Sequence, residues 1–424
     1  MPETQTLSPY DVLVARFRRA RQASRALSIA TTKRKNAALE AIALALVQQS
    51  EAIVSANERD LSLGAENGLS MALQDRLRLD GSRIGALADA VRNVIALPDP
   101  IGQVIRGGRL PNGLRLEQVR VPLGVLGVIY EARPNVTVDI ASLAIKSGNA
   151  VVLRGGSAAQ NTNATLVEVL REAIASVEID PEVIQTVDDF GREGAHEMMH
   201  ARGLIDVLIP RGGHGLIQTV VAESTVPVIE TGEGNVHIFL DESADAEMAA
   251  EILVNAKTQR PSVCNAVETL LVHRAAAERL LPVVLGRLRE KGVVVHADEQ
   301  VRAIFSDAVP ATERDWETEY MSLDIAVTIV DSLDEAIAHI DRYSSRHTEA
   351  IITNDVHNAE RFLAEVDAAA VMVNASTRFT DGGEFGFGAE VGISTQKLHA
   401  RGPMGLPELT STKWLVRGDG QVRA

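Results

Sequence analysis

The chain has a single cysteine, Cys264, among its 424 residues. One cysteine excludes a disulfide within the chain, and it cannot supply a thiolate cage for zinc. We expect no metal site among the ten histidines either. We also expect a reducing, cytoplasmic location, because a protein without disulfides is suited to that compartment.

Positive charge and long apolar runs are lacking as well. The formal net charge of −15 argues against a nucleic-acid partner, which needs a basic face opposite its phosphates. No run of 18 apolar residues occurs, so we predict no membrane span. Residues 12–39 have the Arg-rich, acid-free composition of a transit peptide. The helical spacing of Leu13, Phe17, Ala20, Ser24 and Leu27 favours a structural helix instead.

What is present describes a multidomain globular protein, since single cores rarely exceed roughly 250–300 residues. A second helical pattern follows the first and continues toward Asn57. Further helices are expected to about residue 100, with stops at Gly64, Gly68, Gly81 and the Pro98-Asp-Pro breaker. Residues 104–121 alternate around a Pro-Asn-Gly turn and predict a hairpin that projects as an oligomer arm.

Short apolar strands and longer helices alternate through the rest of the chain. This order predicts an α/β fold with two mostly parallel sheets, each covered by helices on both faces. The predicted strands of the first set are residues 125–130, 150–153, 184–187, 204–209, 226–229 and 236–240. Those of the second set are residues 267–272, 293–295, 325–330, 350–352 and 370–373.

Two glycine clusters follow predicted strands and precede predicted helices. They begin at Arg154 and Arg211, and the fingerprint G-x-G-x-x-G and a Walker A motif are both absent. Backbone amides at a helix start can receive phosphate, and arginine adds charge-assisted contacts. Each cluster taken alone is equally consistent with a tight turn. The candidate cofactor residues are Arg154, Gly155, Arg211, Gly212 and Gly213.

Cys264 is the candidate nucleophile. A lone cysteine most often serves as a small buried apolar residue. Here Pro261 prevents a helix from running through the segment, and the residues just upstream are polar or cationic, among them Lys257 and Arg260. Nearby cations raise the thiolate fraction of a cysteine.

Four long segments carry a family resemblance. They are VPLGVLGVIYEARPNVT at 121–137, SGNAVVLRGG at 147–156, RFTDGGEFGFGAE at 378–390 and ISTQKLHARGPMG at 393–405. The chain resembles the gamma-glutamyl phosphate reductases, part of the aldehyde dehydrogenase superfamily, over nearly its whole length. The resemblance implies a cofactor-binding domain at 1–104 and 122–234 and a catalytic domain at 235–375. It also implies a β arm for oligomerisation at 105–121 and 393–424, and a loop beside substrate and cofactor at 376–392.

The resemblance implies NADPH-dependent reduction of L-glutamyl 5-phosphate to L-glutamate 5-semialdehyde in proline biosynthesis. Cys264 would form a thioester, and Asn135 would help to hold the oxyanion. Glu230 matches the general base of hydrolytic members. It stands in Glu-Thr-Gly-Glu, where those members have Glu-Leu-Gly-Gly, so a structural carboxylate is an equal alternative.

Further roles follow from the resemblance or from charge type. Arg154 would lie beside the adenosine ribose, and a cation without a nearby ribose-binding acid favours NADPH over NADH. Glu319 would hold the nicotinamide ribose. Lys257 and Arg260 are candidates for the leaving phosphate. Arg378 and Asp381 have the charges needed for the α-carboxylate and α-ammonium of the substrate.

The expected partners are the small-molecule substrate, further copies of the chain in a homo-oligomer, and the glutamate 5-kinase that makes the unstable acyl phosphate. Two alternatives stay open. One is another acyl or aldehyde oxidoreductase of the superfamily, and the other is a non-catalytic protein that keeps the fold.

Overall fold

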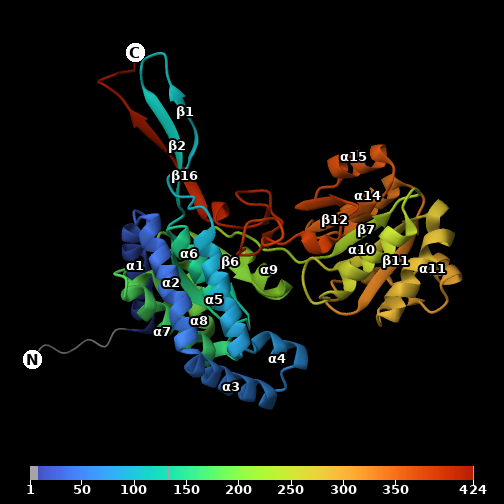
Figure 1. Ribbon diagram of the computed structural model, residues 1–424, viewed down its shortest axis with the longest axis horizontal. Coiled ribbons are helices and arrows are strands. Elements are labelled where there is room, and N and C mark those ends of the chain that lie inside the picture. Colours follow the sequence, from blue (N-terminus) through green and yellow to red (C-terminus); the bar gives the residue numbers. More distant parts are fainter. Residues whose placement is uncertain (1–7, 132, 424) are drawn as a thin grey trace, which may run out of the picture. The chain divides into compact units, whose positions relative to one another are not determined.

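The computed structural model describes residues 8–131 and 133–423 (Figure 1). The chain forms two compact units. Unit 1 consists of Met1–Glu230, Gly386–Gly392 and Met404–Ala424, and unit 2 of Thr231–Phe385 and Ile393–Pro403. The first boundary lies at Glu230, before the predicted one at 234, and the predicted loop 376–392 is divided between the units.

Unit 1 begins with a run of helices, as the periodicity predicts. They are α1 (Pro9–Leu27), α2 (Thr32–Gln48), α3 (Ser50–Glu66), α4 (Met71–Leu77) and α5 (Gly81–Ala96). Ser8 and Asp11 form a capping box that starts α1, and all five predicted core residues of that helix are buried. Three predictions are wrong: the second helix breaks at Gln49, the predicted stop Gly64 lies inside α3, and Gly81 begins α5 behind its cap Asp80.

The sheet of unit 1 is parallel, with strand order β5-β4-β3-β6. Its strands are β3 (Val125–Tyr130), β4 (Ala150–Arg154), β5 (Ile184–Thr186) and β6 (Val207–Arg211). The helices between and after them are α6 (Asn135–Lys146), α7 (Gln160–Ala175), α8 (Gly191–His200) and α9 (His214–Glu223). Short 3-10 turns occur at Ser157–Ala159, Pro181–Val183 and Asp188–Phe190. The predicted strand 226–229 is wrong, because Val228 makes a single bridge to Leu208.

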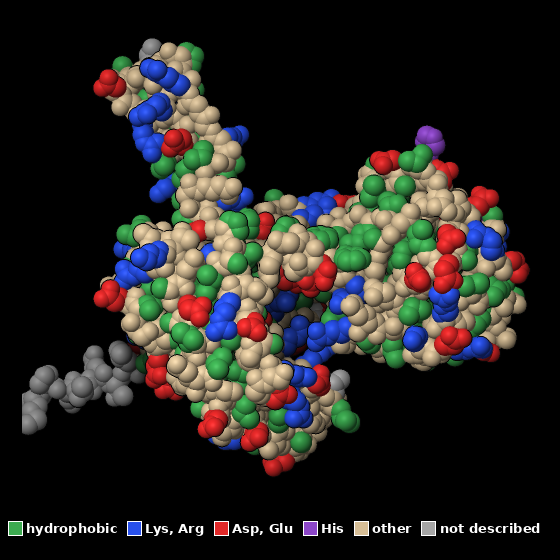
Figure 2. Space-filling model, in the orientation of Figure 1, with side chains coloured by type: hydrophobic (Ala, Val, Ile, Leu, Met, Phe, Trp, Pro, Cys, Tyr) green, Lys and Arg blue, Asp and Glu red, His purple; other side chains and the backbone are tan. Residues whose placement is uncertain are grey.

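The predicted hairpin is confirmed and belongs to a separate antiparallel sheet with order β1-β2-β16. Its strands are β1 (Val104–Arg109), β2 (Arg115–Pro122) and β16 (Thr410–Arg417), the last preceded by the turn Pro407–Leu409. Every residue of β1 is exposed, and basic side chains gather along this sheet (Figure 2). Charged side chains on an edge strand oppose unspecific pairing. Residues 393–403, predicted in the arm, lie instead in unit 2, where β14 (Ile393–Ser394) pairs with β15 (Gly402–Pro403).

The main sheet of unit 2 is parallel throughout, with order β10-β9-β11-β8-β7-β12-β13. The strands are β7 (Val236–Leu240), β8 (Val267–His273), β9 (Val294–Ala297), β10 (Val309–Pro310), β11 (Asp324–Val330), β12 (Thr348–Ile352) and β13 (Ala370–Val373). The helices are α10 (Ala246–Thr258), α11 (Arg274–Glu290), α12 (Glu299–Ile304), α13 (Glu313–Glu317), α14 (Leu333–Tyr343) and α15 (Val356–Glu365), and a 3-10 turn spans Thr377–Phe379.

Alternate residues of the central strands of unit 2 enter two different cores. Ile238 and Leu240 of β7 pack in the core formed with α10 and α11, whereas Phe239 packs in the core formed with α14 and α15. Strands covered on both faces are mostly apolar, which is why these strands lack a regular polar alternation in the sequence.

Within the described parts of the chain, no single helix is long and apolar enough to cross a membrane. The helices α2 and α3 reach that length and composition only when taken together, and the chain bends by 67° between them.

A buried ion pair ties α2 to the Pro-Asp-Pro breaker after α5. Lys35 Nζ lies 2.5 Å from Asp99 Oδ2 and donates a 3.0 Å hydrogen bond to the carbonyl oxygen of Lys146. Lys35 is 1% exposed. Burial acts to raise the pKa of Asp99, but hydrogen bonds from Lys35, Ile101 and Thr32 outweigh burial and lower it.

We expect Asp99→Asn to lower the free energy of unfolding by about 3–5 kcal/mol at pH 7, because Lys35 would keep a buried charge without its carboxylate. Chemical denaturation measures this difference. A lowered carboxyl pKa stabilises the fold above the pKa of the unfolded chain, about 3.9, and this contribution disappears as the pH falls through the folded value. The difference should therefore shrink on acidification. The control Asp89→Asn breaks an exposed pair with Arg92 and should cost less than about 1 kcal/mol. Equal losses in both variants would contradict this assignment.

Candidate active site

Cys264 lies in the turn between α10 and β8 and is partly buried. The helix ends at Thr258, before Pro261, as the sequence predicts. The turn closes with a 3.0 Å hydrogen bond from the Ala266 amide to the Val263 carbonyl oxygen. The sulfur is therefore carried on a short bend at the start of a buried strand.

Gly234 packs directly against the peptide of Cys264. A Cβ atom at position 234 would lie 1.4 Å from the Cys264 carbonyl oxygen, so no side chain fits there. The Gly234 amide also donates a 2.9 Å hydrogen bond to Glu319 Oε1. Within unit 2, the structure thus brings Glu319, a predicted cofactor residue, to the glycine that borders the thiol.

The segment of residues 376–381, called the return segment below, is bonded to residues on both sides of Cys264. Thr377 Oγ1 donates to the carbonyl oxygen of Asn265 at 2.8 Å. Asn265 Nδ2 donates to the carbonyl oxygens of Thr380 and Arg378 at 2.9 and 3.4 Å. Arg378 Nε donates to Gln259 Oε1 at 2.9 Å. These bonds hold the predicted substrate residue Arg378 beside the cysteine turn.

The charges of this region act on one another. Burial lowers the pKa of Arg378, while the negative charges of Asp381 and Cys264 raise it and the positive charge of Arg260 lowers it further. Arg260 is exposed, and Asp381 is partly buried. The structure therefore groups three of the predicted substrate residues with the predicted nucleophile.

Lys257, the fourth predicted substrate residue, does not belong to this group. Its side chain is 0% exposed, and Nζ lies 2.7 Å from Glu268 Oε2 and 2.9 Å from the carbonyl oxygen of Val267. Burial lowers the pKa of Lys257, although the negative charge of Glu268 acts to raise it. Burial also raises the pKa of Glu268, to about 7. The prediction that Lys257 binds the leaving phosphate is wrong, because its ammonium is buried with another anion.

Asn135 is the first residue of α6 in unit 1. Its Nδ2 donates a 3.1 Å hydrogen bond to Oδ2 of Asp139, one turn later. Burial raises the pKa of Asp139 to about 6, although Asn135 and the charge of Arg211 lower it. The amide group carries two N–H bonds, and the contact with Asp139 uses one of them.

Arg154 ends β4 and Gly155 follows it, as predicted. Arg154 is partly exposed, and its Nε donates to the Gly191 carbonyl oxygen at 3.3 Å. The Gly155 amide donates a 2.6 Å hydrogen bond to Asp188 Oδ1, and burial raises the pKa of that carboxyl. The fold therefore places an acid, Asp188, near Arg154, which the sequence did not reveal. A guanidinium has five N–H donors, so the bond to Gly191 is compatible with a phosphate contact.

Arg211, Gly212 and Gly213 connect β6 to α9. The Gly213 amide donates to Glu131 Oε2 at 3.0 Å, and a Cβ atom at Gly212 would lie 2.7 Å from Cδ of Glu131. A carboxylate therefore stands where the sequence predicts bound phosphate. An anion can bind this amide only if Glu131 moves away.

Glu230, the predicted general base, is partly buried and is the last residue of the first segment of unit 1. Cys264 belongs to unit 2. The role of Glu230 stays a prediction.

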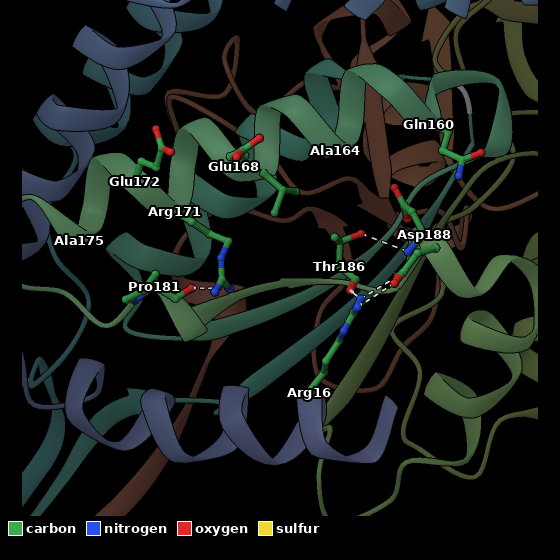
Figure 3. Close-up of a pocket in the computed structure, with 12 residues that line it drawn as sticks. Arg16, Gln160, Ala164, Glu168, Arg171, Glu172, Ala175, Pro181, Thr186 and Asp188 are labelled. Atoms are coloured by element: carbon green, nitrogen blue, oxygen red, sulfur yellow. Dashed lines mark hydrogen bonds and ion pairs between the residues drawn. The ribbon is translucent and has the colours of Figure 1, made fainter. Parts of the chain in front are cut away.

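A pocket of about 600 Å³ lies in unit 1 between α1, α7 and the segment after β5 (Figure 3). Each of its two arginines is bonded to another residue that lines the pocket. Arg16 pairs with Asp189 at 2.7 Å, and Arg171 donates to the Pro181 carbonyl oxygen at 2.9 Å. Asp188, which binds Gly155, also lines it. With its cations paired to its own walls, the pocket offers poor binding to an anion.

One group of possible metal ligands occurs among the described residues. Donor atoms of Glu193, His196 and Glu197 on α8 lie within 4.8 Å of one another, and two of these residues are exposed. Residues 196–200 read His-Glu-Met-Met-His, the H-E-x-x-H pattern, which the expectation of no metal site overlooked. The expected absence of a metal stays a prediction.

Sequence reasoning missed Gly234, Asn265 and Asp188. A glycine directly before an apolar strand is a signal for close backbone approach, and this signal was present at Gly234. Asn265 and Asp188 act through backbone groups that are distant in the sequence, so residue type alone does not reveal them.

Comparisons with known proteins identify the family of this chain. The family described as "Aldehyde dehydrogenase family" matches residues 11–303. The gamma-glutamyl phosphate reductase of Clavibacter michiganensis is 63% identical over 420 residues, which cover 99% of this chain and 97% of that protein. That of Leifsonia xyli is 63% identical over 412 residues, covering 97% and 98%.

The crystal structure of gamma-glutamyl phosphate reductase from Thermotoga maritima has a TM-score of 0.95 and 50% identity, and the match covers 97% of this chain and 100% of that one. An acetylating aldehyde dehydrogenase from Geobacillus thermoglucosidasius, 18% identical with a TM-score of 0.71, shares the fold. The chain therefore belongs to the aldehyde dehydrogenase family and, within it, to the gamma-glutamyl phosphate reductases.

Proposed function

We propose that this chain catalyses the NADPH-dependent reduction of L-glutamyl 5-phosphate to L-glutamate 5-semialdehyde and phosphate, a step of proline biosynthesis in the cytoplasm. Membership of the reductase family supports the overall reaction. The observation that carries the mechanism is the single cysteine on a bend between cationic residues, with Arg378 close enough for their charges to interact.

In the first step, the Cys264 thiolate attacks the acyl carbon of the substrate, and phosphate leaves with the electrons of the broken C–O bond. The product on the protein is a thioester. Arg260 and Arg378 are suited to the departing phosphate, since both are cationic and lie near the cysteine. We assign this role to them and withdraw it from the buried Lys257.

In the second step, a hydride adds to the thioester carbon, and rupture of the C–S bond releases the aldehyde and returns the thiolate. NADPH supplies the hydride when it is bound. Asn135 and the backbone N–H of Cys264 would donate to the oxyanion in both steps, at about 3 kcal/mol per donor. Reduction needs no activated water, so Glu230 is proposed equally as a general base and as a structural carboxylate.

For the cofactor, we propose that Arg154 contacts the ribose phosphate of NADPH and that Glu319 binds the nicotinamide ribose. Asp188 is bonded to the Gly155 amide, which limits its competition for that ribose. We propose no phosphate contact for Gly213 while Glu131 occupies its amide.

We further propose a homo-oligomer that uses the three-stranded sheet, whose strand β1 is exposed throughout. A contact with glutamate 5-kinase would protect the acyl phosphate from water. Both proposals concern surfaces and are independent of the cysteine chemistry.

The reaction is tested in reverse with glutamate semialdehyde and NADP. We expect NADP reduction that requires inorganic phosphate and is lost in Cys264→Ala, because phosphate must cleave the thioester. The absorbance of NADPH measures the rate. Oxidation that proceeds without phosphate, or with coenzyme A in its place, would contradict the proposal and favour another oxidoreductase of the superfamily.

A second prediction concerns Arg154. We expect Arg154→Ala to raise KM for NADPH about 10- to 100-fold and to leave KM for NADH within about twofold, since a charged hydrogen bond contributes about 1.5–3 kcal/mol. Steady-state rates with both cofactors measure this. Arg25→Ala, which removes an exposed arginine on α1, should change neither value. Equal increases for the two cofactors would show that Arg154 does not bind the extra phosphate.

A third prediction concerns Gly234. We expect Gly234→Ala to lower kcat about 100-fold or more, because the new methyl group must displace the Cys264 peptide and a shift of about 1 Å costs that much. Gly286→Ala is the matched control. A Cβ atom there meets nothing within 4 Å, and the variant should keep its activity. Normal activity in Gly234→Ala would refute the role of this contact.

A further inference from the structure

The return segment follows β13 and is fastened at several points to the two sides of the cysteine turn. Besides the bonds of Thr377 and Asn265, Ser376 Oγ donates to Asn255 Oδ1 on α10 at 2.6 Å. Thr348 Oγ1 at the start of β12 donates to Thr380 Oγ1 at 2.9 Å. The segment is thereby held along its length, and Arg378 lies in its middle.

Asn265 is the central fastening point. It is 4% exposed and follows Cys264 directly in the chain. Its side chain donates to two carbonyl oxygens of the return segment, and its own carbonyl oxygen accepts from Thr377. Since carbonyl oxygens accept only, the NH2 end of the amide must face the segment. Asn265 thus joins the nucleophile and the segment that carries Arg378.

The charges that act on Arg378 come from several elements: Cys264 before β8, Arg260 after α10, and Asp381 and Glu384 in the segment after β13. Glu319 is bonded to Gly234, which borders the peptide of Cys264. A cation near a thiol stabilises the thiolate, and a nearby carboxylate opposes it. If Arg378 were lost from this position, Arg260 would be the remaining cation of this group to counter the effect of the carboxylates on the thiolate.

We propose that Asn265 is a positioning residue that holds Arg378 beside Cys264, so that the guanidinium stabilises the thiolate used in catalysis. The proposal rests on the proposed function in one respect, that Cys264 is the nucleophile. Asn265 contacts neither substrate nor cofactor, and it acts through Arg378.

The test is the rate of alkylation of the full-length chain by iodoacetamide as a function of pH, without substrate or cofactor. Cys264 is the only cysteine, so the rate reports this thiol alone. We expect Arg378→Gln to lower the rate at pH 7 about tenfold, with the midpoint of the profile at higher pH and an unchanged plateau. Asn265→Ala should lower the rate about three- to tenfold in the same way.

The decisive comparison is the double variant. If Asn265 acts through Arg378, adding Asn265→Ala to Arg378→Gln should leave the profile unchanged, because the interaction is already lost. If Asn265→Ala shifts the profile of the Arg378→Gln variant as much as it shifts that of the unaltered chain, the proposal is overturned. It is also overturned if the profile of Asn265→Ala coincides with that of the unaltered chain.

Further variants separate positioning from loss of folding. Thr377→Val removes the hydroxyl that donates to Asn265 and should shift the midpoint upward, whereas Thr377→Ser keeps the hydroxyl and should not. Asn354→Ala is the matched control, since its amide donates to the Ser243 carbonyl oxygen at 3.0 Å elsewhere in unit 2. An equal shift in that control would overturn the proposal. Alkylation needs no substrate, so it can be measured whether or not the chain has reductase activity. If the expected shifts occur in a chain that lacks this activity, the inference is supported and the proposed function is refuted.

Discussion

The close contact between Gly234 and the Cys264 peptide is the constraint on which the candidate site depends. It follows from the sheet of unit 2, in which β7 and β8 are parallel neighbours and Val236 is paired with Val267. Residues just before each strand must then lie side by side, and the chain has room for them because position 234 has no side chain. The same contact places the amide of Gly234 against Glu319. One backbone approach thus connects the thiol to a predicted cofactor residue.

Burial separates the cations that the sequence predicted for the substrate into two kinds. Lys257 of α10 and Glu268 of β8 form a buried ion pair that links the helix to the strand. Arg378 keeps a charge that acts on Cys264 while its main chain is bonded to Asn265. The difference in role arises from depth and partners, since the two residues carry the same charge.

The sequence predicted most elements of the fold because apolar strands and capped helices are local patterns. It predicted the parallel sheets, the hairpin and the bend at Cys264, but not the break at Gln49 or the placement of residues 393–403, which depend on packing with distant segments. For the site, charge type selected Arg260, Arg378 and Asp381, and the structure groups them. The errors at Lys257 and beside Arg154 have a common cause: Glu268 and Asp188 approach only in the fold.

The two units carry their candidate residues at opposite ends of their strands. In unit 1, Arg154 and Arg211 end their strands, at the carboxyl edge where parallel sheets commonly bind ligands. In unit 2, Cys264 and Gly234 precede their strands. The proposed chemistry depends on Cys264 carrying the acyl group as a thioester. Mass spectrometry of the chain, quenched in acid after mixing with glutamate semialdehyde and NADP without phosphate, tests it directly. The account predicts a glutamyl adduct on the peptide containing Cys264, removed by added phosphate. A chain that turns over with phosphate while forming no such adduct would contradict it.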